Sequence, residues 1–156
     1  MRTTRQLRKG MPMIKVIKIS RPEELQQSHE IRIEVFVEEQ HVPVQEEMDE
    51  FEEVSLHYLA LIDGIAAGTA RWRVTEKGIK LERFAVKRNY RRLGVGSALV
   101  KYILDEIKKN PGLDDKEIYL HAQLDAMPLY AKFGFTKTGN LFEEAGIKHY
   151  KMVKLS

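Results

Sequence analysis

The chain has 156 residues, 43% of them hydrophobic and 31% charged, a composition typical of one globular domain. It contains no cysteine, which excludes a disulfide framework, a thiolate zinc site and a cysteine nucleophile. No apolar run approaches membrane-spanning length, the first residues of the sequence lack the apolar core typical of a secretion signal, and the net charge of +3 accompanies no nucleic-acid-binding motif. We therefore expect a cytoplasmic protein that binds neither membrane nor nucleic acid.

The amino-terminal part of the chain predicts a strand followed by a long helix. Residues 1–12 are expected to form a disordered arm or an extension. An apolar run over residues 14–19 predicts a strand. Pro22, followed by acidic residues, indicates a helix start, and the helix is expected to continue to about Gln40 before Pro43 interrupts it.

Three strands are expected in the middle of the chain. Residues 56–62 and 66–74 read as two strands, and Asp63-Gly64 between them favours a hairpin turn. Alternation over residues 79–86 predicts the third strand, which leads into a basic turn.

A basic segment with two glycines follows this strand: Arg91-Arg92-Leu93-Gly94-Val95-Gly96-Ser97. We call residues 91–97 the glycine segment. It leads directly into an amphipathic pattern that predicts a helix to Lys109, whose apolar face is expected to consist of Val95, Leu99, Tyr102, Ile103 and Ile107. Glycines allow close backbone approach, and the first N–H groups of a helix lack intrahelical partners, so the segment could bind a pyrophosphate. It matches neither G-x-G-x-x-G nor G-x-x-x-x-G-K-[ST], and a tight strand-to-helix turn is the alternative.

The remaining elements complete an α/β pattern. The helix is expected to stop at Asn110-Pro111-Gly112, before a strand over residues 118–123. A short helix over about residues 126–132 and a closing strand over residues 149–155 follow. This alternation predicts a mixed sheet with helices packed on it.

Four stretches of the sequence carry a family resemblance. LERFAVKRNYRRLGVGSALV and IYLHAQLDAMPLYAKFGF are similar to the acetyl-CoA-binding core of the GNAT superfamily of N-acetyltransferases. IRIEVFVEEQHVPVQEEMDEFEEVSLHYLA and FEEAGIKHYKM resemble its ElaA/YjcF-like branch. The resemblance implies a single acetyltransferase domain over residues 13–156. Its expected fold is a twisted mixed β-sheet flanked by helices and splayed between the fourth and fifth strands, residues 79–86 and 118–123.

The resemblance also implies acetyl-CoA as the cosubstrate, lying in this opening. The cofactor-binding residues that it implies are Phe84, Ala85, Val86, Arg91, Arg92, Leu93, Gly94, Val95, Gly96, Ser97, Gln123 and Tyr130. Arginines 88, 91 and 92 could contact the phosphates, or they could form a solvated basic turn. Acetyl transfer would proceed by direct attack of an amine, with the oxyanion stabilised by main-chain N–H groups near residues 84–86.

Two residues are candidates for proton transfer. Tyr130 stands where the superfamily commonly has a tyrosine near the cofactor sulfur, so we expect a general acid; alternatively, it packs on one helix face. Glu82 could accept the amine proton, and by the period of two it is expected to share a strand face with Phe84 and Val86. A surface or ion-paired carboxylate at Glu82, or a water relay in its place, would be the alternatives.

Acidic residues cluster before the first hairpin: Glu46, Glu47, Asp49, Glu50, Glu52 and Glu53. They could attract a cationic amine, or they could form a solvated face. The branch motif favours Asp49 as a substrate-site residue, and Arg32, Phe36 and Gln40 could line the same pocket.

The five histidines form no recognisable metal motif, so no metal site is expected. His57 and His149 match the branch pattern and could reach the substrate as proton carriers, or they could be structural histidines bonded to the backbone. His121 stands where related sequences often carry asparagine, which leaves Gln123 as the candidate polar contact to the cofactor.

Three functions fit these features. The first is acetyl transfer to a small amine, and the second is a CoA-binding regulatory module with little turnover. A peptide or protein N-acetyltransferase would differ only in its acceptor. Superfamily members often dimerise, so a homodimer is among the expected states.

Overall fold

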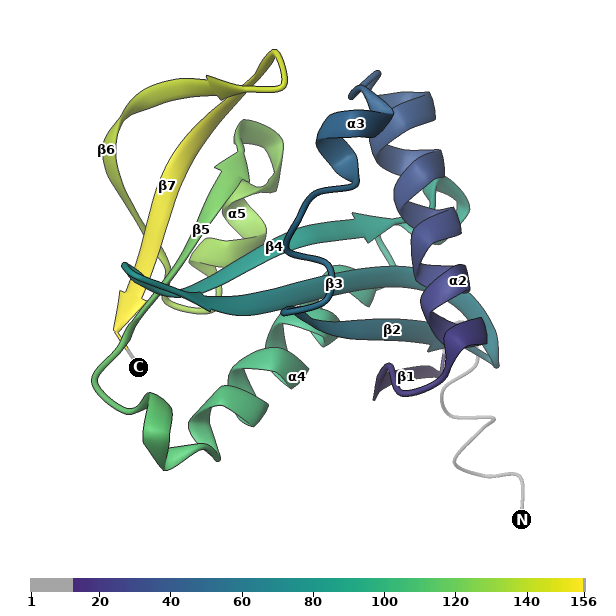
Figure 1. Ribbon diagram of the computed structural model, residues 1–156, viewed down its shortest axis with the longest axis horizontal. Coiled ribbons are helices and arrows are strands. Elements are labelled where there is room, and N and C mark those ends of the chain that lie inside the picture. Colours follow the sequence, from purple (N-terminus) through teal and green to yellow (C-terminus); the bar gives the residue numbers. More distant parts are fainter. Residues whose placement is uncertain (1–12, 156) are drawn as a thin grey trace.

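A mixed seven-stranded sheet forms the centre of the computed structural model, which describes residues 13–155 (Figure 1). The predicted arm, residues 1–12, lies outside the described residues. The strands are β1 (Ile14–Lys18), β2 (Leu56–Ile62), β3 (Ile65–Thr75), β4 (Gly78–Val86), β5 (Glu117–Gln123), β6 (Thr136–Glu144) and β7 (Ile147–Leu155). Their order is β1-β2-β3-β4-β5-β7-β6, and only β4 and β5 are parallel neighbours within the described chain.

Helices pack on both faces of the sheet (Figure 1). The longer ones are α2 (Pro22–Arg32), the π-helix η1 (Ile33–Glu39) and α4 (Val95–Lys108). The short ones are α3 (Val44–Glu47), η2 (Arg88–Tyr90), η3 (Pro111–Leu113), η4 (Leu124–Ala126) and α5 (Met127–Ala131). The predicted helix from Pro22 to about Gln40 is therefore confirmed, with a change from α to π geometry at Ile33. None of the helices within residues 13–155 has the length and apolar character needed to cross a membrane.

Strand β6 is an edge strand that the sequence analysis missed. Its residues are almost all exposed, and its pairing with β7 is irregular between Thr138 and Phe142. An exposed edge strand lacks the alternation of buried and exposed side chains by which a strand is recognised in sequence. The predicted closing strand is present and begins two residues earlier than expected, at Ile147.

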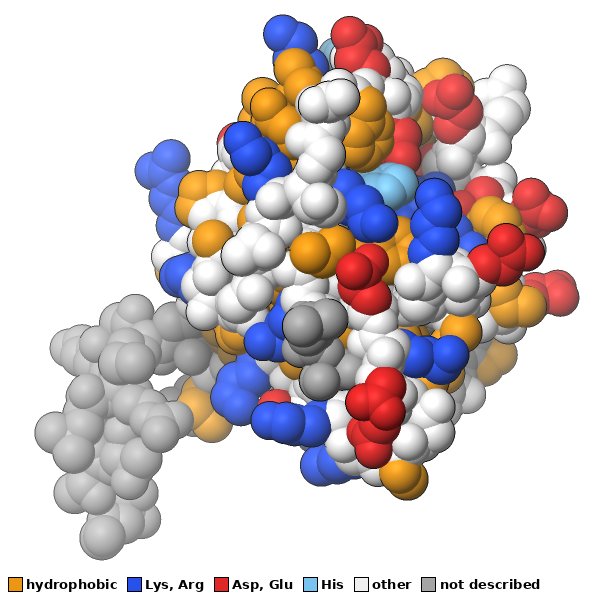
Figure 2. Space-filling view, turned by 90° about the vertical axis from the view of Figure 1, so that its left-hand side faces the viewer, with side chains coloured by type: hydrophobic (Ala, Val, Ile, Leu, Met, Phe, Trp, Pro, Cys, Tyr) orange, Lys and Arg blue, Asp and Glu red, His pale blue; other side chains and the backbone are white. Residues whose placement is uncertain are grey.

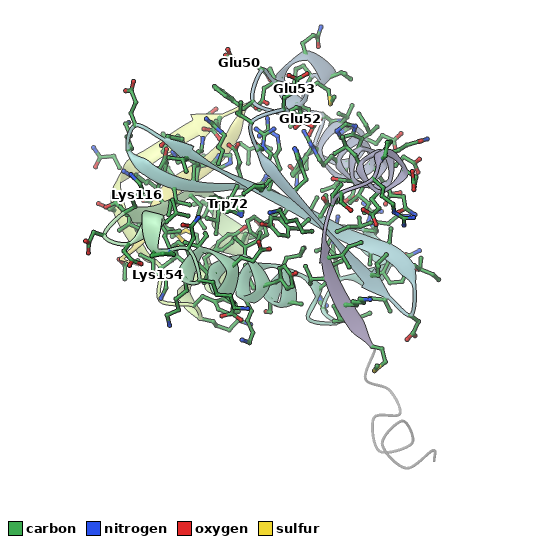
Figure 3. All side chains as sticks on the ribbon, turned by 60° about the horizontal axis from the view of Figure 1, so that its bottom comes forward. Glu50, Glu52, Glu53, Trp72, Lys116 and Lys154 are labelled. Carbon is green, nitrogen blue, oxygen red and sulfur yellow. The ribbon has the colours of Figure 1, made fainter. Side chains whose placement is uncertain are left out.

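The main core lies between the sheet and α4. Val95, Leu99, Ile103 and Ile107 of the predicted apolar face are buried there, and Trp72 lies between β3 and α4 (Figure 3). The fifth residue expected on that face, Tyr102, is 37% exposed. A smaller cluster packs α2 and η1 on the opposite face: Ile31, Val35, Leu59 and Ala85.

A β-bulge interrupts β4 at Arg83, whose φ is 60°. On β3, Thr69 and Arg71 are two residues apart and share a face, but their partners on β4, Ala85 and Glu82, are three residues apart. Because of this extra residue, every later side chain of β4 lies on the opposite face of the sheet from the one it would occupy in a regular strand.

The bulge corrects one prediction. Glu82 faces the side of the sheet that carries α2, whereas Phe84 and Val86 pack against the main core on the side of α4. The period of two holds only along a regular strand, so the expected common face of these three residues is wrong.

The sheet splays open between β4 and β5, as the sequence resemblance implied. Pairing covers only Ile79 with Ile118, Lys80 with Tyr119 and Leu81 with Leu120. Beyond Leu81, β4 has no partner on the β5 side, so this part of its backbone borders an opening.

Candidate active site

A cavity of about 710 Å³ lies where β4 and β5 separate. Its wall combines η1, the segment around α3, β4, β5, α5 and the β6–β7 hairpin. A cavity of this size is in the range that small ligands and cofactors occupy. The structure places the following predicted site residues on the wall: Phe36, Gln40, Asp49, Glu82, Phe84, Ala85, Val86, Arg91, Gln123, Tyr130 and His149.

Other predicted residues lie away from this wall. Most of the glycine segment is outside it, at the start of α4: Arg92, Leu93, Gly94, Val95, Gly96 and Ser97. Arg32 is buried in an ion-pair network beside the cavity, and His57 donates from Nε2 to the carbonyl oxygen of Glu52 at 2.8 Å. Burial lowers the pKa of His57.

The glycine segment forms the amino terminus of α4. Gly94 precedes the helix with a φ of 92°, in the left-handed region that side chains disfavour. Gly96 lies in the first turn, where an added Cβ would stand 3.1 Å from Cδ2 of Leu129. Val95 is buried in the main core, so its side chain packs against the sheet. The first-turn N–H groups of α4, which a helix leaves without intrahelical partners, are suited to an anion.

Arg91, at the start of the glycine segment, and the nearby Arg88 share one carboxylate. The Nη2 atom of Arg91 donates to Oε1 of Glu39 at 2.9 Å, and Nη2 of Arg88 lies 3.4 Å from Oε2 of the same residue. The Nε atom of Arg91 donates to the carbonyl oxygen of Val86 at 2.9 Å, which orients the guanidinium. The two exposed arginines thus converge on one anion, the carboxylate of Glu39. A phosphate group could take the place of this carboxylate.

Tyr130 is a buried tyrosine on the cavity wall. It is 6% exposed, and its ring packs edge-on against Phe84 with centroids 5.7 Å apart. Among the described residues its hydroxyl has no hydrogen-bond partner. Burial raises the pKa of Tyr130, so the hydroxyl keeps its proton and can act as a donor.

Buried arginines bind much of the acidic cluster. Glu47 accepts from Nε of Arg32 at 2.5 Å, and Nη2 of Arg71 lies 2.6 Å from Asp49. Nη1 of Arg71 also donates to Glu52 at 2.5 Å. Because these three carboxylates are already paired, they cannot also supply free negative charge to an amine.

The other members of the acidic cluster point outward. Glu50 and Glu53 are exposed, whereas Glu52 lies over the sheet on the side opposite α4 (Figure 3). Glu46 is exposed and reaches the cavity wall. Glu50 and Glu53 therefore fit the interpretation as a solvated face. Glu46 is the member of the cluster that could still attract a cationic amine.

Glu52 makes the fold sensitive to acid. Burial acts to raise its pKa, but the hydrogen bond and charge of Arg32 lower the pKa of Glu52 from 4.5 to about 2. A depressed folded-state pKa stabilises the fold fully above the unfolded value, and this stabilisation is lost as the pH falls from about 4.5 toward about 2. We expect urea titrations to show a lower free energy of unfolding at pH ~3 than at pH ~5, with a weaker pH dependence in Glu52→Gln. The exposed Glu53 supplies the control, because Glu53→Gln should keep the wild-type pH dependence of the free energy of unfolding. An unchanged pH dependence in Glu52→Gln would contradict the role of Glu52 in acid sensitivity.

Glu82 lies among cations. Its Oε2 accepts from Nε of Arg71 and from Nε of Arg73, both at 2.8 Å, and Nζ of Lys80 is 3.4 Å from Oε1. Burial acts to raise the pKa of Glu82, but the bond from Arg73 and the charges of Arg71 and Lys80 lower it. A carboxylate held in this way is a weak proton acceptor, which argues against Glu82 as the general base.

A glutamine pair crosses the cavity between distant segments. The Nε2 atom of Gln123 on β5 donates to Oε1 of Gln40, which follows η1, at 2.9 Å. Gln123 therefore faces the opening, where its amide is available to a cofactor if the bond to Gln40 is exchanged.

The wall also includes titratable residues that the sequence analysis did not select: Arg73, Lys80, Arg83, His121, Asp125 and Glu144. For Lys80 a signal existed, because it lies two residues before Glu82 on the regular part of β4. Arg83 reaches the wall through the bulge, which has no sequence signature here. Glu144 could not be found because β6 was not recognised. Among residues 13–155, no group of three or more His, Asp or Glu side chains is arranged to hold a metal ion.

Comparisons with known proteins agree with this geometry. A family model described as "Acetyltransferase (GNAT) domain" matches residues 21–156. The chain is 35% identical over 142 residues to YjcF of Bacillus subtilis strain 168, an uncharacterized N-acetyltransferase, covering 90% of this chain and 99% of that protein. Escherichia coli ElaA superposes with a TM-score of 0.77 at 23% identity, covering 92% and 99% of the two chains. Arabidopsis thaliana Naa50, solved with a bisubstrate analogue containing CoA, has a TM-score of 0.68 at 26% identity, covering 90% and 97%.

Proposed function

Because the chain belongs to the GNAT acetyltransferase family, we propose that it transfers the acetyl group of acetyl-CoA to the amine of a small molecule by direct attack in a ternary complex. The observation that carries the proposal is Tyr130, whose protonated hydroxyl has no partner among the described residues and stands on the wall of the opening. A CoA-binding module without chemistry would have no use for a proton donor at this point.

Acetyl-CoA would extend from the glycine segment into the opening of the sheet. The N–H groups at the start of α4 and the guanidinium of Arg91 would meet the phosphates. The pantetheine arm would lie between β4 and β5, where Gln123 can hydrogen-bond its amides. The edge of β4 that faces β5 is unpaired near residues 84–86 and would supply N–H groups to the carbonyl oxygen of the thioester.

The reaction needs three proton transfers around one nucleophilic attack. A base takes a proton from the ammonium, and the neutral amine attacks the acetyl carbonyl carbon. The carbon–sulfur bond then breaks, and Tyr130 donates its proton to the departing thiolate. The phenolate regains a proton from the new amide nitrogen, so that the products are the acetylated amine, CoA and one proton.

The cavity favours a small acceptor. Its volume of about 710 Å³ has to hold the acetyl end of the cofactor as well as the amine. The segment around α3 and the β6–β7 hairpin supply walls on two sides of it.

An acceptor panel tests the proposal. Acetyl-CoA-dependent release of free thiol would be measured with polyamines, amino sugars, amino acids, aryl amines and short peptides, alongside calorimetric acetyl-CoA affinity. We expect release stimulated by a small amine. Stimulation by peptides alone would indicate a peptide or protein acetyltransferase, and tight binding without stimulation would favour the regulatory module. Absence of acetyl-CoA binding would overturn the proposal.

A further inference from the structure

We propose that His149 is the catalytic base that deprotonates the acceptor amine, and that Glu144 is its positioning residue. This inference rests on the proposed function and assigns the one proton transfer for which Glu82 is poorly suited. It is carried by the position of the imidazole, by its tautomer and by the carboxylate beside it.

His149 lies one strand away from the opening of the sheet. It is 6% exposed, and on β7 it pairs directly with Gln123 of β5, whose side chain reaches the cavity. Directly opposite residues on neighbouring strands project from the same face of the sheet. The imidazole therefore lies on the cavity wall at the level where β4 and β5 have separated.

A backbone contact determines the tautomer of His149. Its Nδ1 atom is 2.6 Å from the carbonyl oxygen of Ile147. A carbonyl oxygen can only accept, so Nδ1 carries the proton, and the neutral ring has its lone pair on Nε2. The closest approach of an acidic group to Nε2 is that of Glu144, whose Oε2 is 4.0 Å away, too far for a hydrogen bond. Among the described residues, nothing therefore occupies the lone pair.

Glu144 supplies the negative charge that an imidazolium needs. Its Oε1 accepts from Nδ1 of His121 at 2.8 Å, and this hydrogen bond lowers the pKa of Glu144, so the carboxylate is ionised. After His149 accepts a proton, the carboxylate 4.0 Å from Nε2 stabilises the resulting positive charge. The ring of Phe142 stacks on the imidazole of His149, with the two ring centroids 5.7 Å apart and an interplanar angle of 23°. This stacking holds the imidazole in place.

Other charged groups surround this pair without occupying Nε2. Lys80 on β4 pairs with Glu82 at 3.4 Å, and its charge lowers the pKa of Glu144. His121 on β5 binds Glu144, and Lys151 on β7 pairs with Glu117 at 3.6 Å. Among the described residues, none of these groups is hydrogen-bonded to Nε2 of His149, whose lone pair is directed away from the backbone bond at Nδ1.

The first experiment needs no acceptor and uses the full chain. Nitrogen-15 NMR of the histidine side chains distinguishes the two neutral tautomers, because a protonated and an unprotonated ring nitrogen resonate far apart. At mildly alkaline pH we expect His149 to show a protonated Nδ1 and an unprotonated Nε2. The opposite tautomer would overturn the inference, because Nε2 would then have no lone pair to accept a proton.

The second experiment measures turnover with the most active amine of the acceptor panel. The variant His149→Asn keeps an amide N–H donor near the position of Nδ1 and removes Nε2. We expect kcat to fall by about 100-fold or more, acetyl-CoA affinity to stay unchanged, and the acidic limb of the kcat/KM profile to disappear. The matched control is His57→Asn, since His57 is bonded to the backbone away from the wall and should keep the wild-type profile.

Glu144→Gln tests the positioning role. Loss of a negative charge beside the imidazolium should move the acidic limb of the pH profile to lower pH, a shift that a purely structural role of Glu144 would not produce. A wild-type rate and profile in His149→Asn would exclude His149 as the base while leaving the acetyltransferase proposal intact. Failure of the wild-type protein to bind acetyl-CoA would instead reject the proposed function itself.

Discussion

Replacing Tyr130 with phenylalanine should lower turnover by about 100-fold or more, because the departing thiolate loses its proton donor. The affinity for acetyl-CoA should stay unchanged, since the ring of Tyr130 still packs against Phe84 and Phe135. Stability should also be kept, because the hydroxyl has no partner among the described residues that would be left unpaired. Thiol release and calorimetry on the same preparation separate the two effects.

A second tyrosine provides the control for this prediction. Tyr102 on α4 is 37% exposed, lies outside the cavity wall and packs edge-on against Tyr58. Tyr102→Phe should therefore keep both turnover and affinity. If Tyr130→Phe turned over at the wild-type rate, Tyr130 would have a structural role and another group would protonate the thiolate.

The second large effect is expected at the glycine segment. Gly96→Glu places a carboxylate at the start of α4, where a phosphate of acetyl-CoA is expected, and the like charges should abolish measurable binding, a loss of at least about 100-fold. The fold should survive, because the added Cβ meets the flexible side chain of Leu129 at 3.1 Å and a negative charge favours a helix amino terminus. Calorimetric affinity, with a thermal unfolding curve, measures both.

Gly96→Ala distinguishes charge from bulk. It adds the same Cβ against Leu129 without a charge, so we expect only a small loss of affinity. An equal loss in both variants would indicate a steric effect through α5. Unchanged affinity in Gly96→Glu would remove the phosphate role from the glycine segment.

Surface charge gives a weaker guide to the site than these buried groups. Both basic and acidic side chains are present on the face that carries β6 and β7 (Figure 2). The residues on which the proposals depend instead line the cavity: Tyr130, Glu144 and His149. The chemistry of these side chains depends on their neighbours in the fold.

Elements with a strong local pattern could be predicted from the sequence. The apolar face of α4, the hairpin at Asp63-Gly64 and the start of α2 at Pro22 all depend on residues within a few positions of one another. The order of strands and helices follows from these signals. The resemblance of the glycine segment and of the stretch around Tyr130 then supplied the family, which the comparisons confirmed.

Contacts between distant segments could not be predicted in the same way. Arg71 binds Asp49 and Glu82, partners 22 and 11 residues away, and this pairing converts an apparently free acidic cluster into a buried network. The pairing partner of a charge depends on which strands become neighbours, and no local pattern records that. Strand β6 was missed for a related reason, since its role comes from pairing with β7 and not from a buried face of its own.

The sequence by itself determined the family, the order of most elements and the position of the glycine segment, because short-range periodicity and turn residues encode them. Only the tertiary structure decided which side chains face the cavity. The single extra residue at Arg83 turned Glu82 away from Phe84, and the carbonyl of Ile147 set the proton of His149. The face on which a side chain lies depends on the backbone path, and the ring nitrogen that carries a proton depends on neighbours brought together by folding. Both are therefore properties of the assembled sheet.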